Sequence, residues 1–216
     1  MKNDVDPHDT LGMREWHGDK PGEVVTSLLM AVRVKDPCTA RHCERMARYA
    51  VWLARSIKMP ARKEELLRYC CLLHDIGKIG IADHILPKPG PLSMEERMMI
   101  ELHPVFGADI VRNLRMFAKG VPMILYYLER FDGRGYPRGL KKEEIPFEAR
   151  IMAVVDAFDA MTAGRPYREA MPMSYVVEEL RRESGRQFDP RIVQQFLQLI
   201  ETAWSWVSGP EKRMAA

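Results

Sequence analysis

The sequence has few cysteines, and their spacing excludes two common kinds of stabilising site. Four cysteines occur in 216 residues; two of them are adjacent, at positions 70 and 71, and no two follow the CxxC spacing. We interpret them as reduced thiols in the core of a cytosolic protein. A disulfide framework and a structural zinc site are therefore not expected.

Long apolar runs and a strong excess of charge are also missing. No apolar segment is long enough to cross a membrane, and the N-terminus lacks the hydrophobic region of a signal peptide. The formal net charge of +3 is too small to indicate a surface that coats nucleic acid. We therefore expect a cytoplasmic protein, or the soluble part of a larger one, without membrane segments or general nucleic-acid binding.

Sustained strand alternation is absent, and the apolar periodicity is helical from Glu23 nearly to the C-terminus. A first helix would place Val24, Leu28 and Val32 on its apolar face, and Thr39 is the predicted N-cap of the second. Turn residues separate about seven to nine such segments, so the sequence predicts an all-α fold. We assign residues 1–21 to an N-terminal tail or linker remnant, residues 22–208 to a single helical domain and residues 209–216 to a C-terminal tail.

A histidine and an aspartate stand side by side at the end of one predicted helix. Leu67, the cysteines at 70 and 71, and His74 recur at three- and four-residue steps, so this histidine lies on an apolar stripe. Buried polar groups are costly unless they have partners. A divalent metal ion would satisfy both side chains, because imidazole and carboxylate are common ligands. The alternative is a helix end that carries an unrelated His-Asp pair.

Three other predicted helices also carry an ionisable residue on the apolar stripe. These residues are His42, His103 and Asp156, each four residues from a methionine on its own stripe. A single inward histidine is usually a hydrogen-bonded core residue, but five polar side chains on four stripes would each need a buried partner. One shared metal site supplies all of them, as in helical bundles that build such sites from facing helices.

The order of these residues resembles the HD superfamily of metal-dependent phosphohydrolases. Further segments narrow the resemblance to the HD-GYP family of bacterial cyclic di-GMP phosphodiesterases, over about residues 22 to 200. The matching segments are residues 36–42 (DPCTARH), 74–81 (HDIGKIGI), 86–92 (LPKPGPL), 103–104 (HP), 129–137 (ERFDGRGYP), 149–151 (ARI), 156–162 (DAFDAMT), 165–168 (RPYR) and 188–190 (FDP). An isolated His-Asp pair would be weak evidence, whereas so many segments in order are specific to the family.

One position of the family pattern is not met. Two consecutive metal-binding histidines normally precede the Glu-Arg-x-Asp-Gly segment, and here Tyr127 and Leu128 stand in their place. Leucine cannot ligate a metal, and a neutral phenol is a poor ligand for hard divalent ions.

The resemblance implies a metal site with one complete half and one incomplete half. One ion, iron or manganese, would be held by His42, His74, Asp75 and Asp156. A second ion would share Asp75 and add only His103, and two protein ligands are too few to hold it firmly. We therefore predict one tightly bound divalent transition metal and a second that is weak or absent.

The resemblance also implies the reaction and the residues that perform it. Metal-activated water would attack the phosphodiester of cyclic di-GMP, with Asp75 and Lys78 as catalytic residues. The lysine would stabilise the phosphate or the leaving oxygen. The predicted substrate-binding residues are Tyr136, Asp159, Arg165 and Arg168. Guanidinium groups suit phosphate oxygens, whereas Asp159 either orients a ligand or pairs with an arginine.

Three functions stay open at this stage. The first is a phosphodiesterase whose reduced metal site lowers its activity. The second is a catalytically degenerate signalling module that binds cyclic di-GMP or a protein, which Tyr127 and Leu128 favour. The third is a one-metal hydrolase of another phosphoester. By resemblance, the Gly-Tyr-Pro loop would contact GGDEF-type cyclases, and a second copy of the chain, in a homodimer, is another candidate partner.

Overall fold

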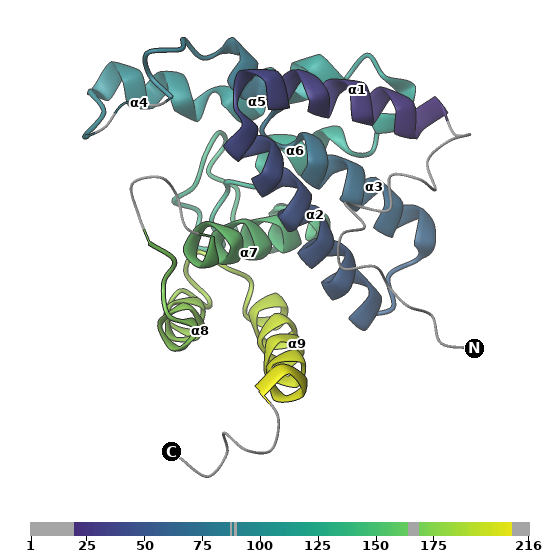
Figure 1. Cartoon of the computed structure of the whole chain (residues 1–216), viewed down its shortest axis with the longest axis vertical. Coiled ribbons are helices and arrows are strands. Elements are labelled where there is room, and N and C mark those ends of the chain that lie inside the picture. Colours follow the sequence, from purple (N-terminus) through teal and green to yellow (C-terminus); the bar gives the residue numbers. More distant parts are fainter. Residues whose placement is uncertain (1–19, 87, 89, 164–168, 209–216) are drawn as a thin grey trace.

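The computed structural model describes residues 20–86, 88, 90–163 and 169–208, which form helices joined by loops and short 3₁₀ segments (Figure 1). The helices are α1 (Lys20–Lys35), α2 (Pro37–Ser56), α3 (Ala61–Leu73), α4 (Met94–Glu101), α5 (His103–Val111), α6 (Val121–Tyr126), α7 (Phe147–Thr162), α8 (Met173–Arg182) and α9 (Pro190–Ser208). No β-sheet occurs in these ranges, so the all-α prediction is confirmed. Residues 1–19 and 209–216, which make up most of the two predicted tails, lie outside the described residues.

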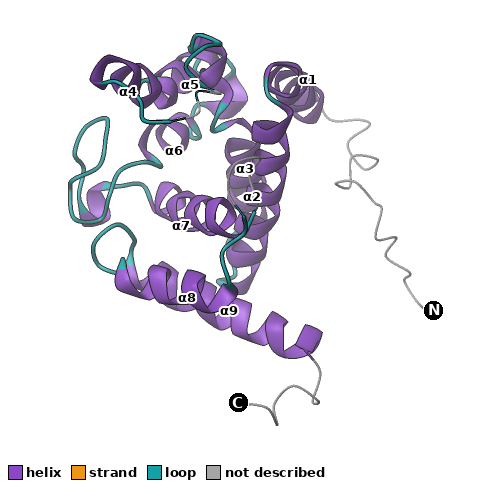
Figure 2. Ribbon diagram, turned by 60° about the vertical axis from the view of Figure 1, so that its left-hand side comes forward, coloured by secondary structure: helices purple, strands orange, loops and turns teal. Residues whose placement is uncertain are grey.

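Helix α2 is the central element and packs against α1, α3 and α7 (Figures 1 and 2). Its buried face consists mainly of small residues, which allow neighbouring helices to approach closely, together with Met46 and Leu53. Both of these larger side chains stand on the stripe predicted from the sequence. The stripe also contains His42, so α2 turns this histidine toward the interior of the helix bundle.

The first turn of α2 differs from the prediction. Its N-cap is Asp36, whose carboxylate accepts hydrogen bonds from the backbone N–H groups of Cys38 and Thr39. Thr39, the predicted cap, instead lies inside the helix and donates its hydroxyl to Asp36 Oδ2. Pro37 occupies the first helical position, where its missing N–H costs nothing, and this places the start of the helix before Thr39.

Helix α1 also differs in detail from its prediction. It begins at Lys20 rather than near Glu23. Its fully buried residues are Val25, Leu29 and Val32, so its apolar face is rotated by one residue relative to the predicted Val24 and Leu28 over the first two turns. Those two residues are partly buried. Consecutive apolar pairs in this segment made either face compatible with the pattern.

The last two helices lie against α7 at one end of the molecule (Figure 2). A buried ion pair between Arg150 of α7 and Asp189 joins this layer to the rest of the bundle. Asp189 also accepts a hydrogen bond from the backbone N–H of Arg191 at the start of α9, and so caps that helix. Ser93 and Glu96 form a capping box at the start of α4.

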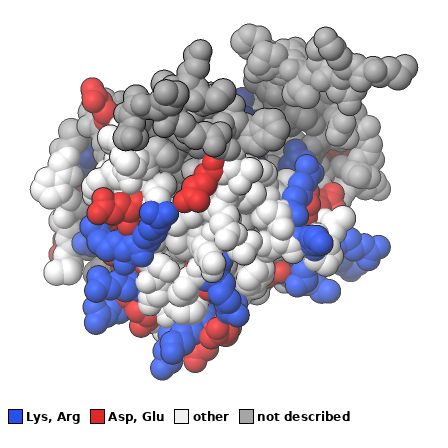
Figure 3. All heavy atoms as spheres, turned by 90° about the horizontal axis from the view of Figure 1, so that it is seen from below, with Lys and Arg blue, Asp and Glu red and all other residues white. Residues whose placement is uncertain are grey.

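The surface at the α8–α9 end carries lysine and arginine side chains interleaved with acidic ones, without a large area of one sign (Figure 3). This agrees with the small net charge. Among the described residues, no helix has the length and hydropathy that a membrane span requires.

Candidate metal centre

The centre begins where α2 faces α7. His42 and Asp156 meet across this interface, with 3.0 Å between His42 Nε2 and Asp156 Oδ1. The other ring nitrogen of His42, Nδ1, lies 2.7 Å from Asp159 Oδ2. Both aspartates belong to α7 and stand three residues apart, so they lie on one face of that helix. The histidine ring is therefore held between two carboxylates.

The end of α3 adds His74 to the same place. His74 is the C-cap of α3 and is buried, and its Nδ1 lies 2.7 Å from the carbonyl oxygen of Cys71 in the preceding turn. One ligand atom from each of His42, His74 and Asp156 lies within 4.8 Å of the others, a spacing that one metal ion can span. Three of the predicted metal ligands are thus brought together.

A glycine contact brings α5 to the centre. The 3₁₀ helix Ile76–Gly80 follows Asp75 directly, and its Gly77 lies against the first turns of α5. A Cβ atom on Gly77 would stand 1.9 Å from the carbonyl oxygen of His103 and 2.5 Å from the backbone nitrogen of Gly107. Only glycine permits this approach. As a result, His103 Nε2 reaches to 3.3 Å from Asp75 Oδ1.

The hydroxyl of Tyr127 occupies the space beside His103 and Asp75. It lies 2.6 Å from His103 Nε2 and 3.3 Å from Asp75 Oδ1. Burial, and then the charge of Asp75, raises the pKa of Tyr127 well above its usual value, so the phenol is neutral. Tyr127 comes from the residue that follows α6 and is buried. It therefore acts as a hydrogen-bonding group between these two residues.

The tautomers of the three histidines can be assigned from their Nδ1 partners. Nδ1 of His74 and of His103 faces a backbone carbonyl, from Cys71 and Ile100 respectively, and a carbonyl can only accept a hydrogen bond. Nδ1 of His42 faces a carboxylate. All three rings therefore carry a proton on Nδ1. This is the arrangement that orients metal-binding histidines in proteins.

The donor set fits a cation. Burial lowers the pKa of His74, so its ring is neutral, and its Nε2 lone pair stands 3.4 Å from Asp75 Oδ2, which is another acceptor. Burial acts to lower the pKa of His42 as well, but its hydrogen bonds to Asp156 and Asp159 outweigh this and raise it to about 9. A positive charge is favoured among these groups, and two imidazoles with carboxylates suit a divalent transition metal.

The HD-type identity of the centre follows from comparison with known proteins. A family model described as "HD domain" matches residues 27–192. The chain belongs to the HD domain family. This HD domain is 37% identical over 181 residues to the "Cyclic di-GMP phosphodiesterase response regulator RpfG" of Xanthomonas campestris, covering 83% of the chain and 48% of that protein.

Further relatives agree with this assignment. A "Cyclic di-GMP phosphodiesterase" of Thermotoga maritima is 39% identical, with 82% of the chain and 49% of that protein covered. "3'3'-cGAMP-specific phosphodiesterase 3" of Vibrio cholerae is 37% identical, with 77% and 36% covered. The chain thus spans about half the length, or less, of these curated relatives. These matches confirm the HD-GYP assignment made from the sequence.

Two solved structures share the fold at low identity. A cyclic GMP-AMP-specific phosphodiesterase of V. cholerae has a TM-score of 0.62 and 22% identity, covering 83% of this HD domain and 48% of that chain. An HDG"Y"P protein of Bdellovibrio bacteriovorus has a TM-score of 0.62 and 20% identity, covering 84% and 61%. Both support the all-helical HD architecture.

Asp75 is placed differently from the other predicted ligands of the first ion. It is buried and close to His74, but the group of His42, His74 and Asp156 does not include it. Its Oδ2 lies 2.7 Å from Lys78 Nζ. Burial alone would raise the pKa of Asp75, but Lys78 and then His74 hold it well below its usual value. Asp75 is therefore an ionised carboxylate between Lys78, His74 and the His103–Tyr127 pair.

Two of the four predicted substrate-binding residues, Tyr136 and Asp159, lie among the described residues. Tyr136 lies half-buried in the Gly-Tyr-Pro loop, and burial, followed by the charge of Glu101, raises its pKa to about 12. Asp159 is buried and pairs with Arg45, the second of the two alternatives left open from the sequence. Arg165 and Arg168 lie outside the described residues.

Sequence reasoning missed two neighbours of the centre. Cys43 forms a second group with His74 and Asp75 and lies 3.7 Å from His74 Nδ1. Burial raises the pKa of the Cys43 thiol well above its usual value, so it stays protonated. The second neighbour that sequence reasoning missed is Arg45, which lies one turn beyond His42 and pairs with Asp159. Its position three residues after a candidate ligand is the signal that could have drawn attention to it.

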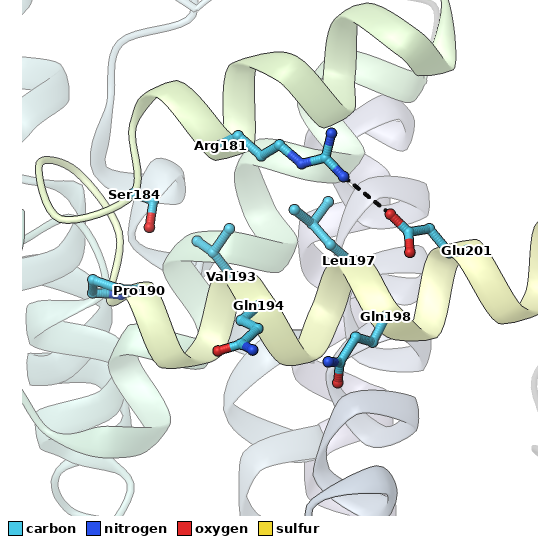
Figure 4. A pocket seen from close by; sticks show the side chains of 8 residues that line it. All are labelled: Arg181, Ser184, Pro190, Val193, Gln194, Leu197, Gln198 and Glu201. Atoms are coloured by element: carbon cyan, nitrogen blue, oxygen red, sulfur yellow. Dashed lines mark hydrogen bonds and ion pairs between the residues drawn. The ribbon is translucent and has the colours of Figure 1, made fainter.

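One hollow of the described surface lies away from these residues. It is a cavity of about 340 Å³ between α8 and α9, and none of the predicted site residues lines it (Figure 4). Arg181 and Glu201 form an ion pair at one end of it. The candidate centre is instead defined by the convergence of side chains from α2, α3, α5 and α7.

Proposed function

We propose that this HD domain is a metal-dependent phosphodiesterase that hydrolyses a cyclic dinucleotide, with cyclic di-GMP as the first candidate. The observation that carries the proposal is the neutral His74, whose Nε2 lone pair faces Asp75 within reach of His42 and Asp156. Two acceptors that face each other in a buried site call for a cation. The relatives are named as phosphodiesterases of cyclic di-GMP or of 3'3'-cGAMP, which supports the choice of substrate.

We propose that one ion, iron or manganese, is held firmly by His42, His74 and Asp156, with Asp75 beside them. When bound, such an ion lowers the pKa of a coordinated water and neutralises phosphate charge. The second predicted ion would need His103, but Nε2 of that ring already shares a hydrogen bond with the Tyr127 hydroxyl. This argues for a single ion and for a lower rate than a two-metal site would give.

The chain's own side chains supply the remaining functions in this proposal. Burial would lower the pKa of Lys78, but Asp75 outweighs this and raises it, so Lys78 carries a positive charge next to the centre. That charge can meet a phosphate oxygen or the leaving oxygen. Tyr136 would contact the substrate from its loop, and Arg165 and Arg168 would bind phosphate. Asp159 is the weakest of the predicted substrate contacts, because both of its oxygens already have partners.

The proposal is tested by incubating the purified protein with cyclic di-GMP or 3'3'-cGAMP and either Mn²⁺ or anaerobic Fe²⁺, and by following product formation. We expect turnover that depends on the added metal. The His74→Ala variant should lose at least about a hundredfold in rate, because the ion that would stabilise the transition-state charge loses one of its ligands. The exposed His84 provides a matched control, and His84→Ala should keep the full rate.

The same experiment separates the other functions. Micromolar binding of cyclic di-GMP without turnover under any metal would reject the enzyme in favour of a binding module. Turnover only of other phosphoesters would indicate a different hydrolase. Contacts with GGDEF-type cyclases and a homodimer remain predictions, for which the family resemblance is the support.

A further inference from the structure

Arg45 holds Asp159 with a two-pronged contact. Its Nε lies 2.7 Å from Asp159 Oδ1, and its Nη2 lies 2.8 Å from Asp159 Oδ2. This fork fixes both the position and the rotation of the carboxylate, since guanidinium and carboxylate match in geometry. The arginine belongs to α2 and the aspartate to α7, so the contact also spans the interface in which the centre is built.

Asp159 passes this constraint to His42. Its Oδ2 accepts the Nδ1 proton of the ring at 2.7 Å, and the opposite ring nitrogen, Nε2, faces Asp156 at 3.0 Å. Asp159 is 1% exposed, so substrate has little access to its carboxylate. Arg45, with 29% of its side chain exposed, is the outermost of these three side chains. The contacts therefore lead from solvent through Arg45 and the Asp159 carboxylate to the metal-facing nitrogen of His42.

We propose that Arg45 and Asp159 are positioning residues that aim Nε2 of His42 at the metal ion, with Arg45 acting only through Asp159. This inference rests on the proposed metal site. Without Arg45, the Asp159 carboxylate can rotate and the His42 ring is held less firmly. Outer partners of metal-binding histidines typically change metal affinity by 10–100-fold.

The experiment is a titration of the metal-free protein with Mn²⁺, in which the Kd is measured by calorimetry or by competition with a chelator. Four proteins are compared: wild type, Arg45→Ala, Asp159→Ala and the double variant. We expect about a tenfold weaker Kd for Arg45→Ala and a 10–100-fold weaker Kd for Asp159→Ala. The double variant should match Asp159→Ala alone, because Arg45 has nothing left to act on. Arg45→Lys, which keeps the charge but loses the fork, should fall between wild type and Arg45→Ala.

Arg55→Ala is the matched control, since Arg55 lies on the same helix and pairs with Glu64 at 2.9 Å, away from the centre. It should leave the Mn²⁺ affinity unchanged. Circular dichroism and the Tm of each metal-free variant identify any that fail to fold, and Asp159→Asn replaces Asp159→Ala in that case. Wild-type protein that binds no Mn²⁺ would reject the proposed metal site itself. If the wild type binds Mn²⁺ but Arg45→Ala binds equally well, or weakens binding further in the Asp159→Ala background, the positioning role is wrong.

Discussion

Each histidine of the centre is fixed through its Nδ1 atom, but the Nε2 atoms have different surroundings. Nε2 of each ring lies near a carboxylate, from Asp156 for His42 and from Asp75 for His74 and His103, but among the three only His103 Nε2 also shares a hydrogen bond with the Tyr127 hydroxyl. A single side chain thus decides whether His103 is available as a ligand. The phenol gives a buried imidazole and a buried carboxylate a neutral partner where the family pattern has a metal-binding histidine.

The first prediction concerns this hydroxyl. Tyr127→Phe keeps the packing of the ring but leaves His103 and Asp75 without their shared partner. Leaving buried polar groups unsatisfied costs about 1–3 kcal/mol, so the free energy of unfolding of the metal-free protein should fall by this amount. Urea denaturation measures the change. The neighbouring, half-buried Tyr126 provides the control, and Tyr126→Phe should alter stability by much less.

The sequence identified which residues could bind a metal ion, but not which other side chains each of them contacts. The stripe positions of His42, His74, His103 and Asp156 already implied an inward orientation. The contact of Asp75 with Tyr127 was not accessible from the pattern, because it depends on how the end of α6 packs against α5. The role of Asp159 likewise required the placement of α2 beside α7.

At the scale of elements, the centre depends on where each helix begins and ends. Helix α2 has its N-cap at Asp36, six residues before His42. The prediction of Thr39 as the N-cap is wrong, because Asp and Thr both favour that position and both stand near this start. The proline at position 37 favours Asp36 as the cap, because proline is favoured at the first helical position.

A second prediction therefore concerns Asp36. Burial raises its pKa, but hydrogen bonds from Thr39 and Cys38 outweigh this and lower the pKa below the ordinary 3.8. A lowered folded-state pKa means stabilisation that is complete well above pH 3.8 and is lost as the pH falls below it. Asp36→Ala should lower the free energy of unfolding by about 0.5–2 kcal/mol at pH 7. This difference from wild type should shrink below pH 3.8.

Chemical denaturation at several pH values measures this difference. Asp109, in an exposed pair with Arg112 on α5, serves as the control, and its alanine variant should cost less than about 1 kcal/mol. A cost for Asp36→Ala that is independent of pH would mean that the carboxylate charge is not what caps α2.

The third prediction concerns the close contact between the 3₁₀ helix and α5. In Gly77→Ala the new methyl group would overlap the backbone of His103, which cannot move as a side-chain end can. We expect the free energy of unfolding to fall by about 3 kcal/mol, at the upper end of the cost of overpacking. Metal binding should also weaken. In Gly80→Ala the nearest atom is in the ring of Phe106, at 3.0 Å, and the side chain can shift. Equal stability of the two variants would show that the contact does not hold α5 in place.

At the scale of the whole molecule, the buried pair of Arg150 and Asp189 joins the layer of α8 and α9 to the helices that carry the centre. Asp189→Ala would leave the Arg150 charge buried without its partner. Breaking one side of a buried pair costs about 3–5 kcal/mol. In comparison, Arg181→Ala breaks an exposed pair with Glu201 and should cost less than about 1 kcal/mol. Thermal unfolding of both variants tests this, and similar values would contradict the assigned role of Asp189.

We propose that the centre holds one ion firmly and that Tyr127 and Leu128, which cannot replace two histidine ligands, prevent firm binding of a second. The most direct measurement is the metal content per chain, by elemental analysis of protein loaded with Mn²⁺ or Fe²⁺ and then desalted. We predict one ion per chain for the wild type, and a second ion when Tyr127→His and Leu128→His are combined. Two ions per chain in the wild type, or none, would show that the one-ion site is wrong. An unchanged metal content in the double variant would show that Tyr127 and Leu128 do not limit the site to one ion.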